Sequence, residues 1–246
     1  MLYNLAVVYS ARNIINDDHV ALKLETVVNH SSSVEREYYI LKQLEGGVGI
    51  PRTFWFGRES MHHVLVLELL GPFSLLNVVN LGVQLYVHSH NYVHGDIKPQ
   101  NILVGLGNSR HTAYIIDFGI TKTYWNTKTS DHVPFRHGRS LSGTPAFASI
   151  NNHLGVEPGR HDNLESLTYM LIYFLRGSLP WLASDDEKLS SSTILEHKAH
   201  ATIAEICHDI PVEFANILIY TCSLAFTEDS DYDHLRSLLH SEGEES

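Results

Sequence analysis

The feature that most constrains the fold is an eight-residue stretch, His94 to Asn101, which reads His-Gly-Asp-Ile-Lys-Pro-Gln-Asn. It places a carboxylate, an ammonium and a carboxamide in one short loop, just before the apolar run Ile102 to Val104. A second run, Tyr114 to Ile116, ends at another carboxylate, Asp117. Short runs rich in β-branched residues predict strands. We therefore expect two strands to bring these polar groups together.

The polar residues of this region are the set that phosphoryl transfer needs. A carboxylate orients the acceptor hydroxyl, a cation sits on the moving phosphoryl group, and an Asn with an Asp holds Mg²⁺ on the nucleotide. Those roles would fall, in that order, to Asp96, Lys98, Asn101 and Asp117. The loop and the Asp-Phe-Gly triplet at Asp117 match two kinase motifs, except that Gly95 replaces an arginine. The joint match is specific, whereas Asp-Phe-Gly alone would be weak.

Length and composition limit the class of protein. A chain of 246 residues, 43% of them apolar, can form one large domain or two lobes with a buried core. The net charge of -11 argues against nucleic-acid or anionic-membrane partners, because phosphate binding needs clustered Lys and Arg. No apolar run approaches the ~20 residues that span a bilayer, and the start lacks the basic region of a signal peptide. The two cysteines are too few for a disulfide framework. We expect a cytoplasmic or nuclear monomer.

The chain before Gly71 predicts a β-rich region with one helix. β-type runs predict strands at Leu5–Arg12, Val20–Leu24, Phe54–Phe56 and Val64–Leu69. The helix follows Ser32, which has the capping-box spacing to Glu35. The glycines from Gly46 to Gly49 come after this helix rather than after a strand, so they are a poor candidate for a phosphate-binding loop.

Two charged residues of this region are expected to pair. Val20 to Lys23 is similar to the Val-Ala-Ile-Lys strand whose lysine grips the α- and β-phosphates. Taken alone, a surface lysine on an edge strand is the better interpretation, because short motifs often match by chance. Glu37 interrupts an apolar helix face, and a buried carboxylate is costly unless it is paired. Lys23 is the obvious partner, and the alternative is a glutamate at the edge of the apolar face with no partner.

The chain after Gly71-Pro72 is predicted to be mainly helical. Periodicity predicts helices at Phe73–His90, Leu164–Phe174, Thr202–Cys207, Val212–Phe226 and Tyr232–Leu239. Polar runs predict loops at Thr121–Gly143 and Ser184–Ser192, and a disordered acidic tail at Ser241–Ser246. The expected division is therefore residues 1–71, 72–240 and 241–246.

From Asp96 to Asn101 the chain resembles eukaryotic protein kinases, and further along it resembles the casein kinase I family of serine/threonine kinases. Segments similar to that family are Val20–Glu25, Glu45–Pro51, Leu69–Pro72, Asp117–Tyr124, Ala148–Leu154, Asp162–Leu167 and Arg176–Trp181. The Ala-Ser-Ile-Asn stretch at Ala148–Asn151 is informative, because that family carries it where other kinases have Ala-Pro-Glu. The likeness runs from about Leu5 to Leu239. It implies an α+β bilobal kinase fold, with a small β-rich lobe containing one helix and a larger, mainly helical lobe.

The resemblance also implies roles for individual residues. Matching positions bind ATP through Lys23, which pairs with Glu37, through Leu67 behind the adenine pocket, and through the backbone of Glu68 and Leu70. The remaining roles are the catalytic base at Asp96, neutralisation of the γ-phosphate by Lys98, and Mg²⁺ binding by Asn101 and Asp117. The implied substrates are serine and threonine hydroxyls of proteins, in an acidic context. Lys98 is the choice typical of serine/threonine rather than tyrosine kinases.

The N-terminal region departs from the family. Counting back from Lys23, the glycines of the phosphate-covering loop would fall near Met1, Tyr3 and Ala6, and none is glycine. We expect the first strand and this loop to be missing or barely begun. ATP binding should then be weaker, because glycine lets backbone N–H groups approach the phosphates closely. The segment Phe73–His90 is also short, with one helix where the family has two.

Three further positions differ from the family pattern. Gly95 replaces the arginine that in many kinases receives an activation-loop phosphate, and Asn163 replaces an aspartate that braces the catalytic loop. Together these changes predict a looser loop. Ala146 stands where the family has an arginine that helps bind a substrate phosphate, so we do not extend to this chain the family's preference for phosphorylated substrates.

Three functions remain open from the sequence. The first is an active serine/threonine kinase, since Lys23, Glu37, Asp96, Asn101 and Asp117 are all retained. The second is a weakly active or inactive pseudokinase that acts as a scaffold, because the glycine loop is lost; a truncated version of an active parent would look the same. The third is a small-molecule kinase, because His-Gly-Asp is typical of aminoglycoside and choline kinase relatives, although Lys98 and Gly143–Ile150 favour a protein substrate.

Overall fold

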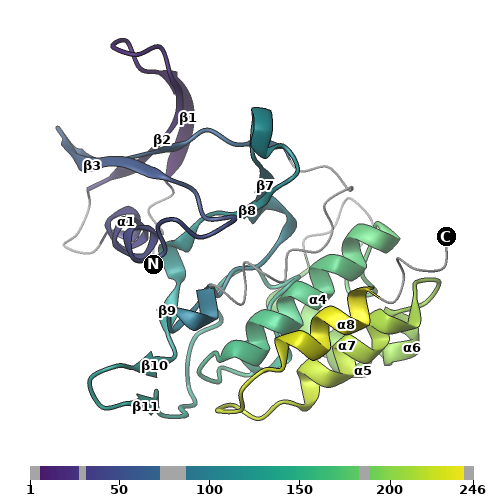
Figure 1. Ribbon diagram of the computed structural model, residues 1–246. Coiled ribbons are helices and arrows are strands. Elements are labelled where there is room, and N and C mark those ends of the chain that lie inside the picture. The colour runs from purple at the N-terminus through teal and green to yellow at the C-terminus, as the bar shows by residue number, and fades with distance from the viewer. Residues whose placement is uncertain (1–5, 28–31, 73–86, 183–188, 241–246) are drawn as a thin grey trace. The chain divides into compact units, whose positions relative to one another are not determined.

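The computed structural model describes residues 6–27, 32–72, 87–182 and 189–240 (Figure 1). Contacts divide the chain into two compact units. The first unit comprises Met1–Asn77 with Gln100–Thr121, and the second comprises Val78–Pro99 with Lys122–Ser246. The predicted helix Phe73–His90 and tail Ser241–Ser246 lie largely or wholly outside the described residues. None of the helices in the described ranges is long and apolar enough to cross a bilayer.

The first unit is built on an antiparallel sheet of four strands. These are β1 (Val7–Arg12), β2 (His19–Thr26), β3 (Thr53–Glu59) and β4 (His62–Glu68), in the order β1-β2-β4-β3. β4 corresponds to the predicted strand Val64–Leu69 and lies between β2 and β3. Ala21 pairs with Leu67 and Lys23 with Leu65. Because directly opposite residues share a face, these four side chains line one face of the sheet.

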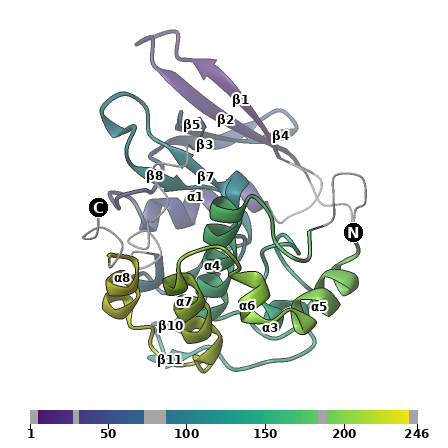
Figure 2. The same cartoon turned by 90° about the vertical axis from the view of Figure 1, so that its right-hand side faces the viewer.

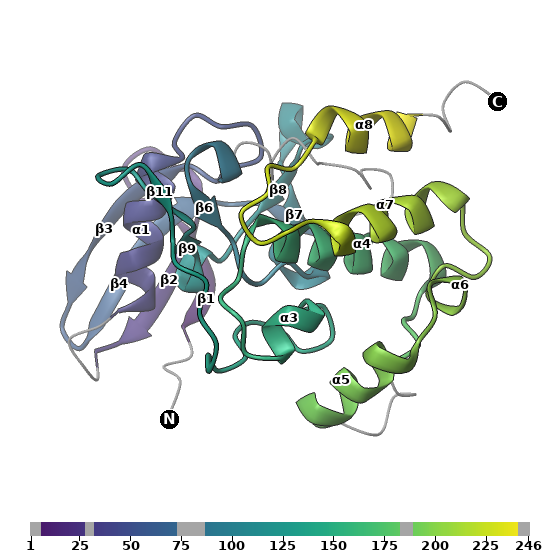
Figure 3. The ribbon, with the colours of Figure 1, turned by 90° about the horizontal axis from the view of Figure 1, so that it is seen from below.

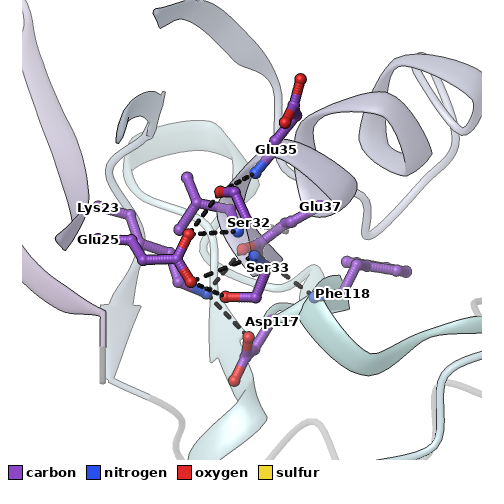
Figure 4. Close-up of polar contacts among 9 residues, drawn as sticks. Lys23, Glu25, Ser32, Ser33, Glu35, Glu37, Asp117 and Phe118 are labelled. Carbon is purple, nitrogen blue, oxygen red and sulfur yellow. Dashed lines mark hydrogen bonds and ion pairs between the residues drawn. The ribbon is translucent and has the colours of Figure 1, made fainter. Parts of the chain in front are cut away.

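Helix α1 (Ser33–Gln43) packs against this sheet and buries Val34, Glu37, Ile40 and Leu41. Its N-cap is Ser32, whose hydroxyl accepts a hydrogen bond from Glu35 N at 3.0 Å, as the capping-box spacing predicted. A second carboxylate at this helix start comes from β2. Glu25 accepts hydrogen bonds from the hydroxyls of Ser32 and Ser33 and from the N–H groups of Ser33 and Val34 (Figure 4). Glu25, two residues after Lys23 on β2, therefore fixes the start of α1.

A smaller sheet in the first unit consists of β5 (Gly71–Pro72), β7 (Ile102–Val104) and β8 (Ala113–Ile115), in the order β5-β7-β8. β7 and β8 pair antiparallel, with Ile102 opposite Ile115. One step further, the N–H of Ile116 donates to the carbonyl of Asn101 at 2.9 Å. This pairing brings Asn101, just before β7, beside the end of β8, where Asp117 begins the short 3₁₀ helix η4 (Phe118–Ile120).

The second unit surrounds the helix α4 (Arg160–Arg176). Every residue from His161 to Ile172 is buried, and the predicted helix Leu164–Phe174 is confirmed within α4. It ends at Gly177, whose φ of 76° is a left-handed conformation that suits glycine. Helix α7 (Val212–Ser223) packs along α4, and α8 (Tyr232–His240) packs along α7 (Figure 2). The shorter helices are α3 (Ile150–His153), α5 (Ser191–His200) and α6 (Ile203–Ile206), with α3 beside α5 (Figure 3).

Several predicted elements of the second unit need correction. α5 begins inside the predicted loop Ser184–Ser192, because Ser190 caps it by accepting from Thr193 N at 3.1 Å. Only Ile194 and Lys198 of this helix are buried, too few to give a helical period in the sequence. The predicted helix Val212–Phe226 ends earlier, at Ser223. The predicted loop Thr121–Gly143 contains short ladders: β9 (Lys122–Thr123) pairs with β6 (Tyr92–Val93), and β10 (Trp125–Asn126) pairs with β11 (Asp131–His132).

Replacing the Glu25 carboxylate should weaken the first unit. Burial would raise the pKa of Glu25, but the hydrogen bonds from Ser32, Ser33 and Val34 outweigh it and lower that pKa. In Glu25→Gln one acceptor oxygen replaces two, so buried donors lose their partners. We expect a loss of about 1 to 3 kcal/mol in unfolding free energy, measured by urea denaturation. Glu59→Gln, on the exposed end of β3, is the matched control. Equal stability of the two variants would contradict this role.

Candidate functional site

The first unit contains a buried lysine held between two carboxylates. Lys23 Nζ lies 2.7 Å from Glu37 Oε2 and 2.8 Å from Asp117 Oδ1 (Figure 4). The Lys23 side chain is 11% exposed and that of Glu37 2%, whereas that of Asp117 is 44% exposed. The predicted Lys23–Glu37 pair is therefore present. Asp117, which lies ninety-four positions along the chain from Lys23, completes a triad of charged residues.

Electrostatics within this triad favour a charged lysine. Burial would lower the pKa of Lys23, but the carboxylates of Glu37 and Asp117 outweigh it and raise that pKa. Burial raises the pKa of Glu37, Asp117 adds to the rise, and Lys23 opposes it. A raised pKa favours the charged form of Lys23 but disfavours the charged form of Glu37. The two residues differ in this way because Lys23 faces two carboxylates, whereas Glu37 faces one ammonium and a second carboxylate. With all three ionised the triad carries one net negative charge, which favours a further cation at the exposed side of Asp117.

The backbone around Asp117 aims this carboxylate at Lys23. Asp117 has φ 68° and ψ 67°, a left-handed conformation that is uncommon for residues other than glycine and that costs conformational energy. The next residue fixes it, because Phe118 N donates to Glu37 Oε1 at 3.3 Å and the Phe118 side chain is fully buried. Outliers of this kind cluster at functional sites. The sequence identified Asp117 but gave no sign of its backbone conformation.

Asn101 and Asp117 form a donor set that suits Mg²⁺. The β7–β8 pairing places them at neighbouring strand ends, and Asn101 is 4% exposed. Mg²⁺ is usually bound by one or two protein oxygen ligands together with substrate phosphates and water. Within the described ranges there is no group of three or more His, Cys, Asp or Glu residues that could form an all-protein metal site. A carboxylate and an amide that share a metal with phosphates fit this arrangement.

The second unit contains the two residues predicted to be catalytic, Asp96 and Lys98. Lys98 Nζ lies 2.7 Å from Asp96 Oδ2, and Asp96 is 9% exposed. Thr144 joins them, because its N–H and its hydroxyl each donate to Asp96 Oδ1 at 2.8 Å. The Thr144 hydroxyl also accepts from Lys98 Nζ at 2.9 Å. The sequence predicted no role for Thr144 itself, since nothing in its local pattern connects it to a loop forty-eight positions away.

A glycine allows this approach of Thr144. Gly143 has φ 80°, and a Cβ added there would lie 2.5 Å from the carbonyl oxygen of Gly95 and 3.1 Å from Asp96 Oδ1. Any other residue would therefore displace the loop that carries Asp96. The Gly143-Thr144 dipeptide is the signal that could have located this part of the site.

A family model for the protein kinase domain matches residues 74–240. The chain belongs to the protein kinase family. The match includes Asp96, Lys98, Asn101 and Asp117, whereas Lys23 and Glu37 precede it. Membership implies a phosphotransferase that uses ATP, usually with Mg²⁺, and that acts on proteins.

In this kinase domain, the loop that carries Asp96 contacts Asn163 of α4. Asn163 Oδ1 accepts a hydrogen bond from Gly95 N at 3.1 Å, so α4 still contacts the loop. Its Nδ2 lies 3.3 Å from His88 Nε2, and His88 Nδ1 contacts the Tyr232 hydroxyl. Gly95 has φ 84°, which glycine adopts without strain. Sequence reasoning missed His88 and Tyr232, because contacts so distant along the chain leave no local pattern.

His88 links α8 to the catalytic loop as a neutral ring. Burial lowers its pKa to about 3, and the positive charge of Arg160 contributes. A ring with its proton on Nδ1 accepts from Asn163 and donates to Tyr232. Protonation would place a hydrogen on Nε2, facing the amide donor of Asn163, and would break this chain of hydrogen bonds.

The residues predicted to line the adenine pocket lie at and just after the end of β4, with Leu67 and Glu68 in the strand and Leu70 beyond it. Leu67 is 8% exposed and shares the face of the sheet that carries Lys23. Glu68 donates its N–H to the Arg52 carbonyl at 3.0 Å, and its carboxylate accepts from Arg52 N at 3.3 Å. Leu70 is half-buried between β4 and β5. The Glu68 N–H is therefore already hydrogen-bonded within the protein.

Acid should destabilise this kinase domain through His88. The unfolded chain binds a proton at His88 below its ordinary pKa of 6.5, whereas the folded protein does so only near 3. Stability from this residue is therefore complete above pH 6.5 and is lost as the pH falls toward 3, by about 1.4 kcal/mol per unit. Urea denaturation at pH 7.5 and 5.5 measures the slope.

The control for this prediction is a pair of substitutions. His88→Gln should flatten the pH dependence, and His62→Gln, at an exposed position of β4, should leave it as in the wild type. If both variants keep the wild-type slope, His88 does not carry the effect.

Proposed function

We propose that this chain is a serine/threonine protein kinase of casein kinase I type that transfers the γ-phosphate of Mg-ATP to protein hydroxyls. The observation that carries the proposal is the buried triad of Lys23, Glu37 and Asp117. A lysine held by two carboxylates from distant segments is poorly explained as a stabilising device, since apolar residues of similar volume often stabilise a protein interior as well or better. It is well explained as a phosphate-binding cation kept charged and oriented.

On the nucleotide side, Lys23 binds the α- and β-phosphates while Glu37 holds its ammonium in place. Asn101 and Asp117 hold Mg²⁺, which neutralises charge on the phosphate oxygens when bound. Leu67 lies at the back of the adenine pocket, the Glu68 carbonyl accepts from adenine, and the Leu70 backbone completes its recognition. The exposure of Asp117 and the net negative charge of the triad support this assignment.

On the acceptor side, Asp96 orients the substrate hydroxyl and receives its proton. The hydroxyl oxygen forms a bond to the γ-phosphorus while the bond to the β–γ bridging oxygen breaks, and ADP leaves. Lys98 neutralises charge on the transferred phosphoryl group. The Thr144 hydroxyl donates to Asp96 and accepts from Lys98, and these hydrogen bonds support the two roles because they fix both side chains relative to each other.

Two features support the serine/threonine and casein kinase I assignment. Lys98, two residues after Asp96, is the serine/threonine-type choice. The Ser-Ile-Asn segment forms a defined structure, since Ser149 caps α3 and donates to Asp162 Oδ1 at 2.6 Å. We infer that substrates are proteins with acidic residues near the acceptor hydroxyl.

A transfer assay with labelled ATP and an acidic protein substrate tests this proposal. Asp96→Asn should lower kcat by a factor of about 10² to 10⁴, because it removes the group that receives the hydroxyl proton. Asp131→Asn, on an exposed position of β11, should match the wild type. Equal transfer by wild type and Asp96→Asn would contradict the proposal.

A weakly active or inactive pseudokinase is the second candidate. It is favoured by the residues near Met1, Tyr3 and Ala6, none of which is glycine. Mg-ATP binding discriminates the two functions. At 100 times the dissociation constant a ligand stabilises the folded state by about 2.7 kcal/mol, so an active kinase should unfold at higher temperature with Mg-ATP.

The same experiment has an internal control. Lys23→Met should abolish the shift, and Lys42→Met, which removes a partly exposed lysine of α1, should retain it. No shift in the wild-type protein would favour the scaffold function.

A further inference from the structure

A lysine in the second unit is buried without a role in the proposed chemistry. Lys198 projects from α5 and is 2% exposed. Its Nζ donates to the carbonyl of Ala148 at 2.5 Å and to that of Pro145 at 3.1 Å. Both carbonyls belong to the segment Thr144–Ile150, which begins at the threonine that contacts Asp96. Lys198 therefore reaches from α5 to the chain that supports the candidate base.

The surroundings of Lys198 are built for an ammonium group. The Nζ lies 4.8 Å from the ring centre of Tyr169 and 4.9 Å from that of Trp181, which are cation–π distances. Burial lowers the pKa of Lys198 to about 7, while the Glu165 carboxylate opposes that shift. Two carbonyl acceptors and two aromatic faces favour the charged form. Because a buried cation is costly, a methionine would fill this space more cheaply, and so packing alone does not explain the lysine.

Neighbouring side chains hold the rest of the same segment. Trp181 Nε1 donates to the Ala146 carbonyl at 2.8 Å, and Glu165 Oε1 accepts from Ile150 N at 3.0 Å and from the Tyr169 hydroxyl at 2.8 Å. Within the segment, Phe147 N and Ala148 N both donate to the Thr144 carbonyl at 3.0 Å. Movement of Ala148 would therefore move Thr144.

We propose that Lys198 is a positioning residue for phosphoryl transfer: it fixes Pro145 and Ala148, so that Thr144 holds the Asp96 carboxylate in its catalytic orientation. The inference rests on the proposed function. Three hydrogen bonds connect Lys198 to Asp96. Lys198 donates to the Ala148 carbonyl, the Ala148 N–H donates to the Thr144 carbonyl, and the Thr144 hydroxyl donates to Asp96 Oδ1. The contacts described above for Lys198 all lie in the second unit, whereas the proposed nucleotide-binding residues Lys23, Asn101 and Asp117 belong to the first. Loss of Lys198 should affect the transfer step and leave ATP binding unchanged.

Lys198→Met tests this assignment, because methionine keeps most of the side-chain volume and removes the charge and the donors. We expect kcat to fall about 10- to 100-fold, since small misplacements of a catalytic group have effects of that size, while the KM for ATP stays unchanged. Lys198→Arg, which keeps a charged donor, should recover part of kcat. Lys128→Met, at an exposed loop position, is the matched control and should match the wild type.

A coupling test separates positioning from general destabilisation. Thr144→Val removes the hydroxyl donor to Asp96. If Lys198 acts through Thr144, the double variant Lys198→Met/Thr144→Val should lose no more kcat than the more impaired single variant. Multiplying losses would show that Lys198 acts independently of Thr144 and would overturn the proposal.

Hydrogen–deuterium exchange gives a readout that does not depend on activity. Lys198→Met should speed exchange at the amides of Phe147, Ala148 and Ile150, and Lys128→Met should not. Unchanged exchange there would overturn the proposal. If the wild-type protein transfers no phosphate, the proposed function fails, and faster exchange would still show that Lys198 fixes the segment. If Lys198→Met does not fold, Lys198→Arg is measured in the same way. We expect its kcat to be lower than that of the wild type and its exchange at these amides to be faster, and wild-type values of both would overturn the proposal.

Discussion

A lysine ammonium in a protein interior is stable only where other groups compensate for its lost hydration, and carboxylates do so most strongly. Lys23 meets this constraint by contacting Glu37 and Asp117, and each contact needs a different part of the first unit. β2 supplies the lysine, α1 supplies Glu37, and the turn after β8 supplies Asp117 in a left-handed conformation. Glu25 ties the start of α1 to β2, so the register of the helix relative to Lys23 is also set by a buried carboxylate.

Much of this arrangement could be predicted from the sequence. Strands β1 to β4, β7 and β8, the apolar helix α4 and the Lys23–Glu37 pair follow from residue patterns, because each pattern reflects burial along a single element. The short strand β5 was not predicted. Helix α5 escaped prediction because only Ile194 and Lys198 of it are buried. Thr144 and His88 escaped because their contacts join segments far apart in the chain, and no local period records such contacts.

Two of the departures from the family pattern, Gly95 and Asn163, contact each other in the structure. Gly95 adopts a positive φ, and its N–H donates to Asn163 Oδ1. The Nδ2 of Asn163 contacts His88 Nε2. An aspartate at 163 would present a second oxygen to His88, which burial keeps neutral. The asparagine supplies a donor there instead. The two differences that together predict a looser loop thus belong to one hydrogen-bonded arrangement that reaches Tyr232 in α8.

Our central proposal is that Lys23, Asn101 and Asp117 bind one magnesium-bound triphosphate and that Asp96 is the base for transfer of its γ-phosphate. A crystal structure of the protein with Mg²⁺ and a non-hydrolysable ATP analogue tests it most directly. The account predicts the Lys23 ammonium on the α- and β-phosphates, Asn101 and Asp117 on the metal, and Asp96 within hydrogen-bonding reach of an acceptor hydroxyl beside the γ-phosphate. A nucleotide bound away from Lys23, or a metal that contacts neither Asn101 nor Asp117, would contradict it.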